Sequence, residues 1–407
     1  MKIAINKKIT LNINPDSTYA VSITAFYVIR MLDECIKDLV GRTFLHWDVF
    51  TLLFYLLNFM LLLYYFLVVE KNIFSLVSME IVVAIAFLIS YLGGYLVRES
   101  LSTTIFNLMV GYIPIGVAAS LMINRKELFD RIYKAALILS PIMIITAIFS
   151  YNKWQYTYDM VLGYNMIFSA LILVSHFLDQ KKIYDLFVSF VLIVMTLFVG
   201  SRGPFICLIA YVVLYVVVSK QLTYKSKIIF LLLIAIALGL IYLNFSVVLN
   251  FLVDLSNKFG FNSRSLVLLI QGNAITHDSG RKILQDHYWE LIRRKPYVGY
   301  GIMGNWINSE NYPHNIAIEL ILSFGYPVAM LFIAFIFYKF ICGLRSNDRV
   351  DSLLSIIFVS YCTSLLVSNS FLRVWQFFVC LGLCRIKYIK VGSLRSSLIS
   401  LGKKKWK

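Results

Sequence analysis

Long uninterrupted apolar blocks dominate this sequence, and they determine the solvent in which it can fold. A membrane-spanning helix needs about 20 mostly apolar residues. Ten blocks approach this length, at 49–69, 72–97, 100–124, 135–152, 160–178, 183–201, 203–219, 228–253, 314–338 and 353–372. Two weaker blocks flank them, at 17–32 and 374–386, and each contains an arginine. The pattern predicts an all-α, polytopic integral membrane protein with about twelve transmembrane helices.

Composition and charge exclude the main soluble alternatives. Hydrophobic residues make up 60% of the chain and charged residues only 14%, whereas a soluble domain has about 45–50% and about 25%. The formal net charge of +17 invites a nucleic-acid interpretation. A nucleic-acid-binding protein, however, gathers its Lys and Arg on one solvated face, and here they sit in short gaps between apolar blocks. Membrane topology explains the charge better, and no nucleic acid is expected as a partner.

The distribution of basic residues predicts the orientation of the chain, because Lys and Arg in short loops remain on the cytoplasmic side. With twelve spans and both termini inside, the inside segments hold 24 of the 38 basic residues. The outside segments hold seven, among them Arg30, Arg202 and Arg373, when the one long outside loop is left out. This asymmetry supports an even number of spans and cytoplasmic termini.

One long hydrophilic interruption, at 254–313, separates the ninth and tenth predicted helices and lies outside the cytoplasm in this topology. Loops of this length are usually functional when they contain structure of their own. This loop carries a helix signature, with Asp278 or Ser279 as N-cap and Pro296 as the stop. The apolar face of that helix is formed by Leu284, Tyr288, Leu291 and Ile292. Since no internal repeat is evident, we interpret 1–407 as a single membrane domain that carries this loop as a helical lid.

Three arginines are candidates for binding an anion at the outer face. Arg202 lies in VGSRGPF between two apolar blocks, where its planar guanidinium suits phosphate oxygens, although a lipid-headgroup anchor explains the position equally well. Arg281 lies in the first turn of the loop helix, where a cation opposes the helix dipole unless an anion is bound. A solvated basic turn is the alternative there. Arg264, in FNSRSL, has no local feature that separates it from a surface arginine.

His314 opens the span that begins NIAIELILSFGYP. An imidazole at the membrane boundary can take a proton from a hydroxyl near neutral pH, although a lone boundary histidine is more often an interfacial or capping residue. The interpretation of His314 as a base is strengthened by the charge count, because this count places Arg202, Arg281 and His314 on the same side of the membrane.

Two polar residues follow His314 in the same segment. Asn315 can orient a neighbouring group by hydrogen bonding, and Glu319 lies about one turn further along the helix. A carboxyl group in lipid is costly and is usually functional or paired. Glu319 therefore either lines a hydroxyl-rich cavity or neutralises an arginine, and the sequence leaves both alternatives open.

Two further patterns are weak. The glycines of GYGIMG satisfy GxGxxG, but they lie in an outside loop with no predicted strand before them, so dinucleotide binding is not expected. Asp286, His287 and Glu290 lie close together, with His277 nearby, yet they form no HExxH or cysteine pattern. We therefore expect no metal and no cofactor.

Taken together, three segments resemble the O-antigen polymerase and ligase family of bacterial polysaccharide assembly. They are the SRG segment that opens a span, the long outer loop whose arginine-bearing helix ends in RRKPYVGYGI, and the segment PHNIAIELILSFGYP. The resemblance covers roughly 200–330, and the order and spacing of the motifs are more specific than any one of them.

The resemblance implies an integral glycosyltransferase at the outer face of the bacterial cytoplasmic membrane. Its donor glycans would be carried on undecaprenyl pyrophosphate, with no nucleotide and no metal. Arg202 and Arg281 would bind the pyrophosphate leaving group, with Arg264 as a weaker candidate. His314 would activate the acceptor hydroxyl, and Asn315 and Glu319 would help to bind substrate.

Polymerase and ligase members share these motifs. We favour a polymerase of O-antigen or of a capsular or exopolysaccharide, because the 60-residue loop and the PHNIAIE segment look closer to polymerases. A ligase that transfers the glycan to lipid A-core is the alternative. A lipid-linked glycan flippase is a further alternative, although the paired repeats and broken midplane helices typical of transporters are not evident. The expected partners are lipid-linked glycans and membrane lipids, with a chain-length regulator and a flippase as further candidates.

Overall fold

The computed structural model describes most of the chain, including the segments around His314. The described residues are 2–6, 9–12, 15–40, 47–70, 104–153, 159–199, 203–220, 223–258, 281–303 and 312–384. The predicted span 72–97 lies outside them, as do Arg202 and Arg264.

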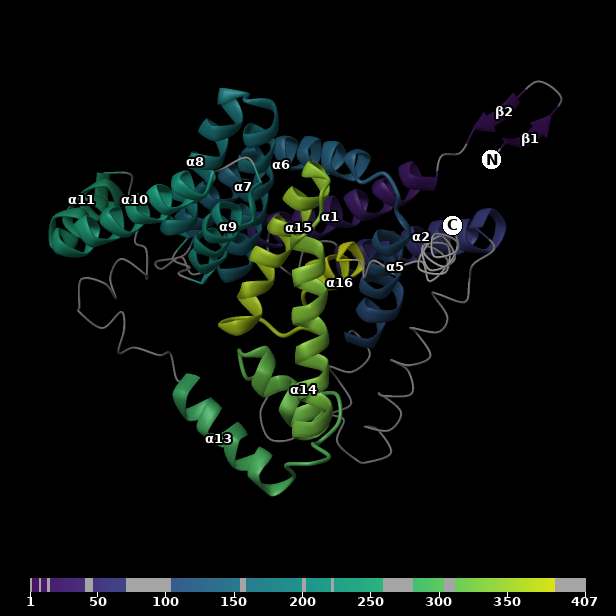
Figure 1. The fold of residues 1–407 in the computed structure, drawn as a ribbon. Coiled ribbons are helices and arrows are strands. Elements are labelled where there is room, and N and C mark those ends of the chain that lie inside the picture. The colour runs from purple at the N-terminus through teal and green to yellow at the C-terminus, as the bar shows by residue number, and fades with distance from the viewer. Residues whose placement is uncertain are drawn as a thin grey trace, which may run out of the picture.

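A short β-hairpin precedes the helices. The sequence patterns did not predict this hairpin. Strand β1 (Lys2–Asn6) pairs with β2 (Ile9–Asn12) in antiparallel register, with Ile3 opposite Leu11. This hairpin lies in the polar segment before the first apolar block. The chain then becomes helical (Figure 1).

The helices correspond closely to the apolar blocks of the sequence. In chain order they are α1 (Pro15–Val40), α2 (Trp47–Tyr64), η1 (Tyr65–Glu70), η2 (Asn107–Tyr112), α5 (Ile113–Leu121), α6 (Lys126–Lys153), α7 (Met160–Gln180), α8 (Ile183–Phe198), α9 (Pro204–Val218), α10 (Tyr224–Leu243), α11 (Phe245–Lys258), α13 (Arg281–Arg294), α14 (Ile316–Leu344), α15 (Arg349–Cys362), η4 (Thr363–Leu366) and α16 (Trp375–Leu383).

Among the described residues, six helices are long and apolar enough to cross a membrane. They are Val49–Val68, Thr104–Leu121, Lys126–Phe149, Met160–Gln180, Ile316–Leu344 and Arg349–Leu366. Helices α8 and α9 are apolar but shorter. A helical membrane protein is therefore confirmed, whereas the count of twelve spans stays a prediction.

The block predicted as one span at 228–253 is divided in the structure, because two helices occupy this stretch. Helix α10 ends at Leu243 and α11 begins at Phe245. At the break, the side-chain Nδ2 and the backbone N of Asn244 both donate to the carbonyl oxygen of Leu240, each at 3.0 Å. A local side-chain bond of this kind competes with helix continuation, and apolar periodicity alone does not reveal it.

The span predicted at 353–372 also ends early, because the helix gives way to a turn after Leu366. The carbonyl oxygen of Ser364 accepts from the backbone N of Val367, Ser368 and Asn369 at 3.2, 2.9 and 3.2 Å. These bonds replace the helical pattern and turn the chain. Residues 367–374 are thereby released from the helix, and we call 368–373 the serine turn.

Aromatic side chains from four helices pack together in the centre of the bundle. The Trp375 ring of α16 lies 5.7 Å from Phe26 of α1 and 5.8 Å from Phe168 of α7, centroid to centroid. Phe168 in turn lies 5.4 Å from Phe358 of α15. All four rings are nearly fully buried. Edge-on pairs of this kind each contribute about 0.5–1.5 kcal/mol beyond burial, and here they hold the first and last described helices against the middle of the chain.

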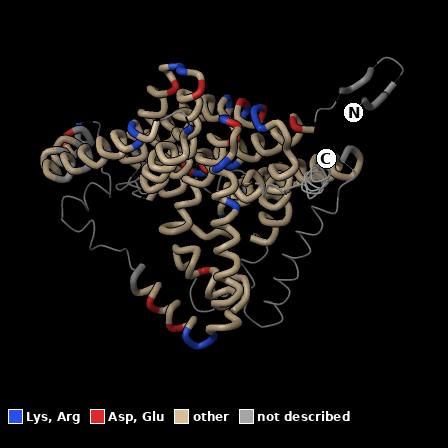
Figure 2. The backbone as a smooth tube through the Cα atoms, viewed as in Figure 1, with Lys and Arg blue, Asp and Glu red and all other residues tan. Residues whose placement is uncertain are grey.

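The connecting segments gather at two ends of the bundle. At one end, Arg349 pairs with Asp179 at 3.0 Å and Lys220 donates to the carbonyl oxygen of Ser346 at 3.3 Å. These contacts join three loops that the charge count assigns to the same side. Figure 1 shows α13 at the opposite end from the α7–α8 turn, and in Figure 2 the charged residues gather mostly at these two ends.

Candidate functional site

His314 occupies a strained position immediately before α14. Its φ is +56°, in the left-handed region that few residues other than glycine adopt. Backbone strain of this kind costs about 1–3 kcal/mol and clusters at functional sites, where the surrounding contacts enforce it. The imidazole is half-buried, and its Nδ1 lies 3.0 Å from the carbonyl oxygen of Ser368.

The contact with Ser368 fixes the tautomer of the neutral ring. A carbonyl oxygen can only accept a hydrogen bond, so Nδ1 of His314 must carry the proton. Nε2 is then the basic nitrogen of the ring. A general base needs this arrangement, because the proton must be accepted by a nitrogen whose partner nitrogen is held in place.

Tyr312 supports the same arrangement from the other side. Its phenol donates to the same carbonyl oxygen of Ser368 at 2.9 Å. The Tyr312 ring also lies 4.3 Å from the His314 ring, centroid to centroid. A hydrogen bond and a ring contact therefore both help to hold the imidazole.

Asn315 is the N-cap of α14. Its side-chain Oδ1 accepts from the backbone N of Ala317 at 2.9 Å and of Ile318 at 3.3 Å. Such a cap satisfies two of the N–H groups that a helix start leaves unpaired, and it contributes about 1 kcal/mol. Asn315 thus fixes where α14 begins, next to His314, while its contact with substrate stays a prediction.

Glu319 is buried, with 2% of its surface exposed, and it binds the serine turn. Its Oε1 accepts from the hydroxyl of Ser370 at 2.5 Å, and its Oε2 accepts from the backbone N of Phe371 at 3.3 Å. The sequence left two roles open for Glu319, lining a hydroxyl-rich cavity or neutralising an arginine. Neither of them includes this anchoring of the serine turn. The substrate-binding role of Glu319 stays a prediction.

The SRG segment reaches this site through Gly203, whose neighbour Arg202 lies outside the described residues. A Cβ atom on Gly203 would lie 2.3 Å from the hydroxyl oxygen of Tyr164 and 2.8 Å from the hydroxyl oxygen of Ser368. Only glycine fits so close to both groups. The start of α9 is therefore packed against the serine turn and lies near His314.

The loop helix predicted at 279–296 is α13, and its predicted buried face is confirmed. Tyr288, Leu291 and Ile292 are buried and Leu284 is half-buried. Arg281 is the first residue of α13, and its side chain lies outside the described part of the structure.

The segment after α13 docks onto a break in α14. Tyr326 donates its backbone N–H to the carbonyl oxygen of Pro296 at 2.8 Å, and Pro327 has no N–H to donate. The carbonyl oxygens of Leu322 and Ser323 therefore lose their helical partners. They accept instead from the backbone N of Tyr300 and Gly301, at 2.7 and 2.8 Å.

Glycines make this docking possible. Gly299, Gly301 and Gly325 all have positive φ, at 70°, 80° and 72°. A Cβ atom on Gly325 would lie 2.3 Å from the backbone of Tyr297. The glycines of GYGIMG that the structure describes thus bring two backbones together, which explains the pattern without a dinucleotide.

Comparison with known proteins finds a similarity over part of the chain. Residues 187–333 match the family model described as O-antigen ligase. This stretch is similar to that family, and we call it the O-antigen ligase domain after the description of the model. The match agrees with the extent of the resemblance, roughly 200–330. None of the curated proteins and none of the solved structures matches the chain.

The O-antigen ligase domain contains His314, Asn315 and Glu319, but it ends before the residues that hold them. Ser368 and Ser370 lie beyond residue 333, in the serine turn. The sequence analysis missed this turn. A signal was present, since the polar run SNS at 368–370 interrupts the last apolar blocks. The charge count places this run and His314 on the same side of the membrane.

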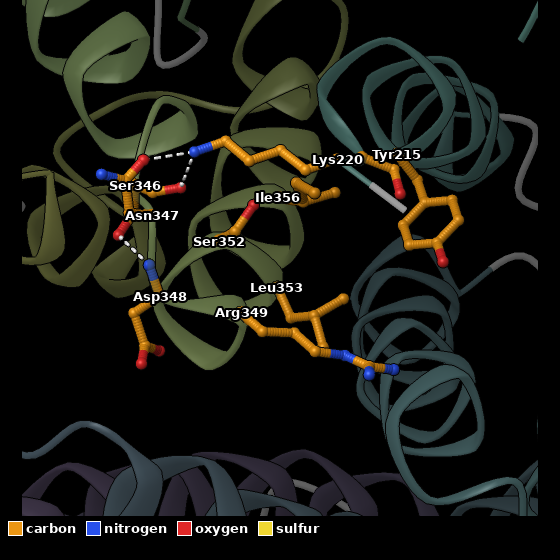
Figure 3. A pocket seen from close by; sticks show the side chains of 10 residues that line it. Tyr215, Lys220, Ser346, Asn347, Asp348, Arg349, Ser352, Leu353 and Ile356 are labelled. Atoms are coloured by element: carbon orange, nitrogen blue, oxygen red, sulfur yellow. Dashed lines mark hydrogen bonds between the residues drawn. The ribbon is translucent and has the colours of Figure 1, made fainter. Parts of the chain in front are cut away.

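A hollow of about 230 Å³ lies between the end of α9 and the α14–α15 connection. Figure 3 shows Lys220 extending across it to Ser346 and Asn347, to both of which its Nζ donates. Helices α9 and α14 begin near His314 and end at this hollow. The hollow is therefore separate from the candidate site, and Lys220 forms hydrogen bonds to other residues of the protein there.

Proposed function

We propose that this protein polymerises undecaprenyl-pyrophosphate-linked oligosaccharide repeat units at the outer face of the bacterial cytoplasmic membrane, with both termini in the cytoplasm. The product would be an O-antigen or a capsular or exopolysaccharide. The O-antigen ligase domain already indicates a membrane enzyme of the polymerase or ligase type. The observation that carries the proposal is the His314–Ser368 hydrogen bond, which supplies an oriented base within this domain.

The reaction is a displacement at the anomeric carbon of the donor glycan. The acceptor hydroxyl oxygen forms the new bond to that carbon while its proton passes to Nε2 of His314. The bond from the anomeric carbon to the pyrophosphate oxygen breaks, and undecaprenyl pyrophosphate leaves with the electron pair. A base for the nucleophile and cations for the leaving group together lower the barrier.

The arginines of the domain are proposed as the cations. Gly203 lies against the serine turn, and its neighbour in the sequence, Arg202, is proposed to bind the pyrophosphate, together with Arg281 at the start of α13. Arg264 remains a weaker candidate for the same role. Guanidinium groups suit this task because their planar donors match phosphate oxygens in pairs.

Asn315 and Glu319 are proposed to shape the substrate-binding surface beside the base. Asn315 sets the start of α14 and Glu319 fixes the serine turn, so both define the position of His314 relative to the acceptor. The α13 segment, docked on the break in α14, would cover the glycans while the polyprenyl tails remain in lipid.

Purified full-length protein in detergent tests the reaction type. It is incubated with undecaprenyl-pyrophosphate-linked repeat units, without nucleotide and with a chelator, and the products are separated on a gel. We expect a ladder of multiples of the repeat. A ladder that requires a divalent metal would contradict the metal-independent mechanism.

The same preparation separates the alternatives. If no ladder forms but added lipid A-core becomes glycosylated, the protein is a ligase, which the description of the matched family favours. If neither product forms while the protein moves lipid-linked repeats across vesicle membranes, it is a flippase.

A further inference from the structure

Arg373 lies at the end of the serine turn, outside the O-antigen ligase domain. It is exposed, although the residues on both sides of it, Leu372 and Val374, are buried. The turn is fixed to α14 through Glu319 and through the carbonyl oxygen of Ser368. The backbone of Arg373 is also held directly, because its carbonyl oxygen accepts from the phenol of Tyr112 at 3.4 Å. The guanidinium thus projects from a backbone held by several partners.

Tyr312 connects Arg373 to the proposed base. The Arg373 guanidinium carbon lies 5.4 Å from the centroid of the Tyr312 ring, which is a cation–π contact. The His314 ring lies 4.3 Å from the same ring. A base and a cation therefore both contact one phenol. In a displacement at an anomeric carbon, the base and the leaving-group cation must both be held within reach of that carbon.

Arg373 acts electrostatically on two groups beside it. One is the carboxylate of Glu319, whose oxygens also accept hydrogen bonds from Ser370 and Phe371. The other is Tyr112, which also feels the positive charge of Arg30. Arg30 pairs with Asp33 and Glu34 at 3.6 and 3.7 Å and its side chain is 24% exposed, whereas Arg373 belongs to the exposed residues.

We propose that Arg373 binds a phosphate oxygen of the undecaprenyl pyrophosphate group, beside the His314 base. This inference rests on the proposed function and adds a substrate-binding residue that the O-antigen ligase domain does not contain. Arg373 would hold the leaving group from the side of the serine turn.

Direct binding of undecaprenyl pyrophosphate tests this role without turnover. The full-length protein carries His314→Ala throughout, and the affinity of the free lipid pyrophosphate is measured in detergent for Arg373→Gln. The matched control is Arg345→Gln, since Arg345 is also exposed but lies at the other end of α14. We expect binding to weaken about tenfold or more for Arg373→Gln, because a charge-assisted contact is lost. Binding within twofold of the control would overturn the proposal.

A second variant keeps the test decisive if Arg373→Gln does not fold. Arg373→Lys retains the charge but loses the planar pair of donors, and we expect binding several-fold weaker than wild type. Binding of Arg373→Lys equal to wild type would count against the proposal. If wild-type protein binds the lipid but forms neither ladder nor glycosylated core, the proposed function fails while the Arg373 contact stands.

Discussion

The imidazole Nδ1 of His314 lies 3.0 Å from the carbonyl oxygen of Ser368, although 54 residues separate the two along the chain. This hydrogen bond joins the start of α14 to the turn between η4 and α16. It fixes the proton of the neutral ring on Nδ1 and leaves Nε2 as the basic nitrogen. The candidate site therefore depends on how these two segments pack against each other.

Gly203→Ala is expected to disturb the packing of α9 against the serine turn. The added methyl would lie 2.3 Å from the hydroxyl oxygen of Tyr164 and 2.8 Å from that of Ser368. Overpacking of this kind costs about 1–3 kcal/mol. Thermal unfolding in detergent measures the loss, and polymer formation should fall with it.

Tyr164→Phe supplies the control for this prediction. It removes the oxygen that a methyl at residue 203 would meet first, so it should partly restore the stability of Gly203→Ala. A double-mutant cycle measures the coupling between the two sites. If the two changes are simply additive, the close approach between Gly203 and Tyr164 is not the cause.

Gly325→Ala is expected to release the loop end from the break in α14. The alanine would carry a φ of +72°, and its methyl would lie 2.3 Å from the backbone of Tyr297. Strain and clash together should cost about 2 kcal/mol or more. Limited proteolysis after α13 should become faster in this variant.

Gly239→Ala is the matched control, because a methyl at this position in α10 meets nothing within 4 Å. Its stability should remain unchanged or rise slightly, as alanine favours helix. Equal proteolysis of the two variants would mean that the α14 break does not hold the loop.

Glu319→Gln is expected to loosen the serine turn. Glutamine keeps one oxygen that can accept from Ser370, but its amide N cannot accept from the backbone N of Phe371. A buried N–H left without its acceptor costs about 1–3 kcal/mol. The combination with Ser370→Ala should cost less than the sum of the single changes. A variant with unchanged stability and a higher KM for lipid-linked substrate would instead make Glu319 a substrate ligand.

The sequence predicted the local features of the fold well. The predicted blocks 160–178, 183–201 and 203–219 correspond to α7, α8 and α9. The apolar face of α13 was predicted correctly because periodicity within one helix records burial directly.

The features that the sequence did not predict depend on contacts between distant segments or on single polar side chains. Asn244 breaks an apolar block with one side-chain bond. Ser368 holds His314 through its backbone carbonyl, so the polar run SNS indicates a turn but does not reveal this contact. The same holds for the backbone bonds between Tyr300 and Leu322. The candidate base His314 could therefore be singled out from the sequence, but the groups that orient its ring could not.

The most direct test of the central claim is the initial rate of polymer formation by His314→Ala. His287→Ala is the matched control, because His287 is a half-buried histidine of the same domain, on α13. Loss of a general base should lower the rate by about 10²–10⁴-fold, while His287→Ala stays near wild type and both variants bind undecaprenyl pyrophosphate as wild type does. A His314→Ala variant that polymerises within a few-fold of wild type would contradict the assignment of His314 as the base.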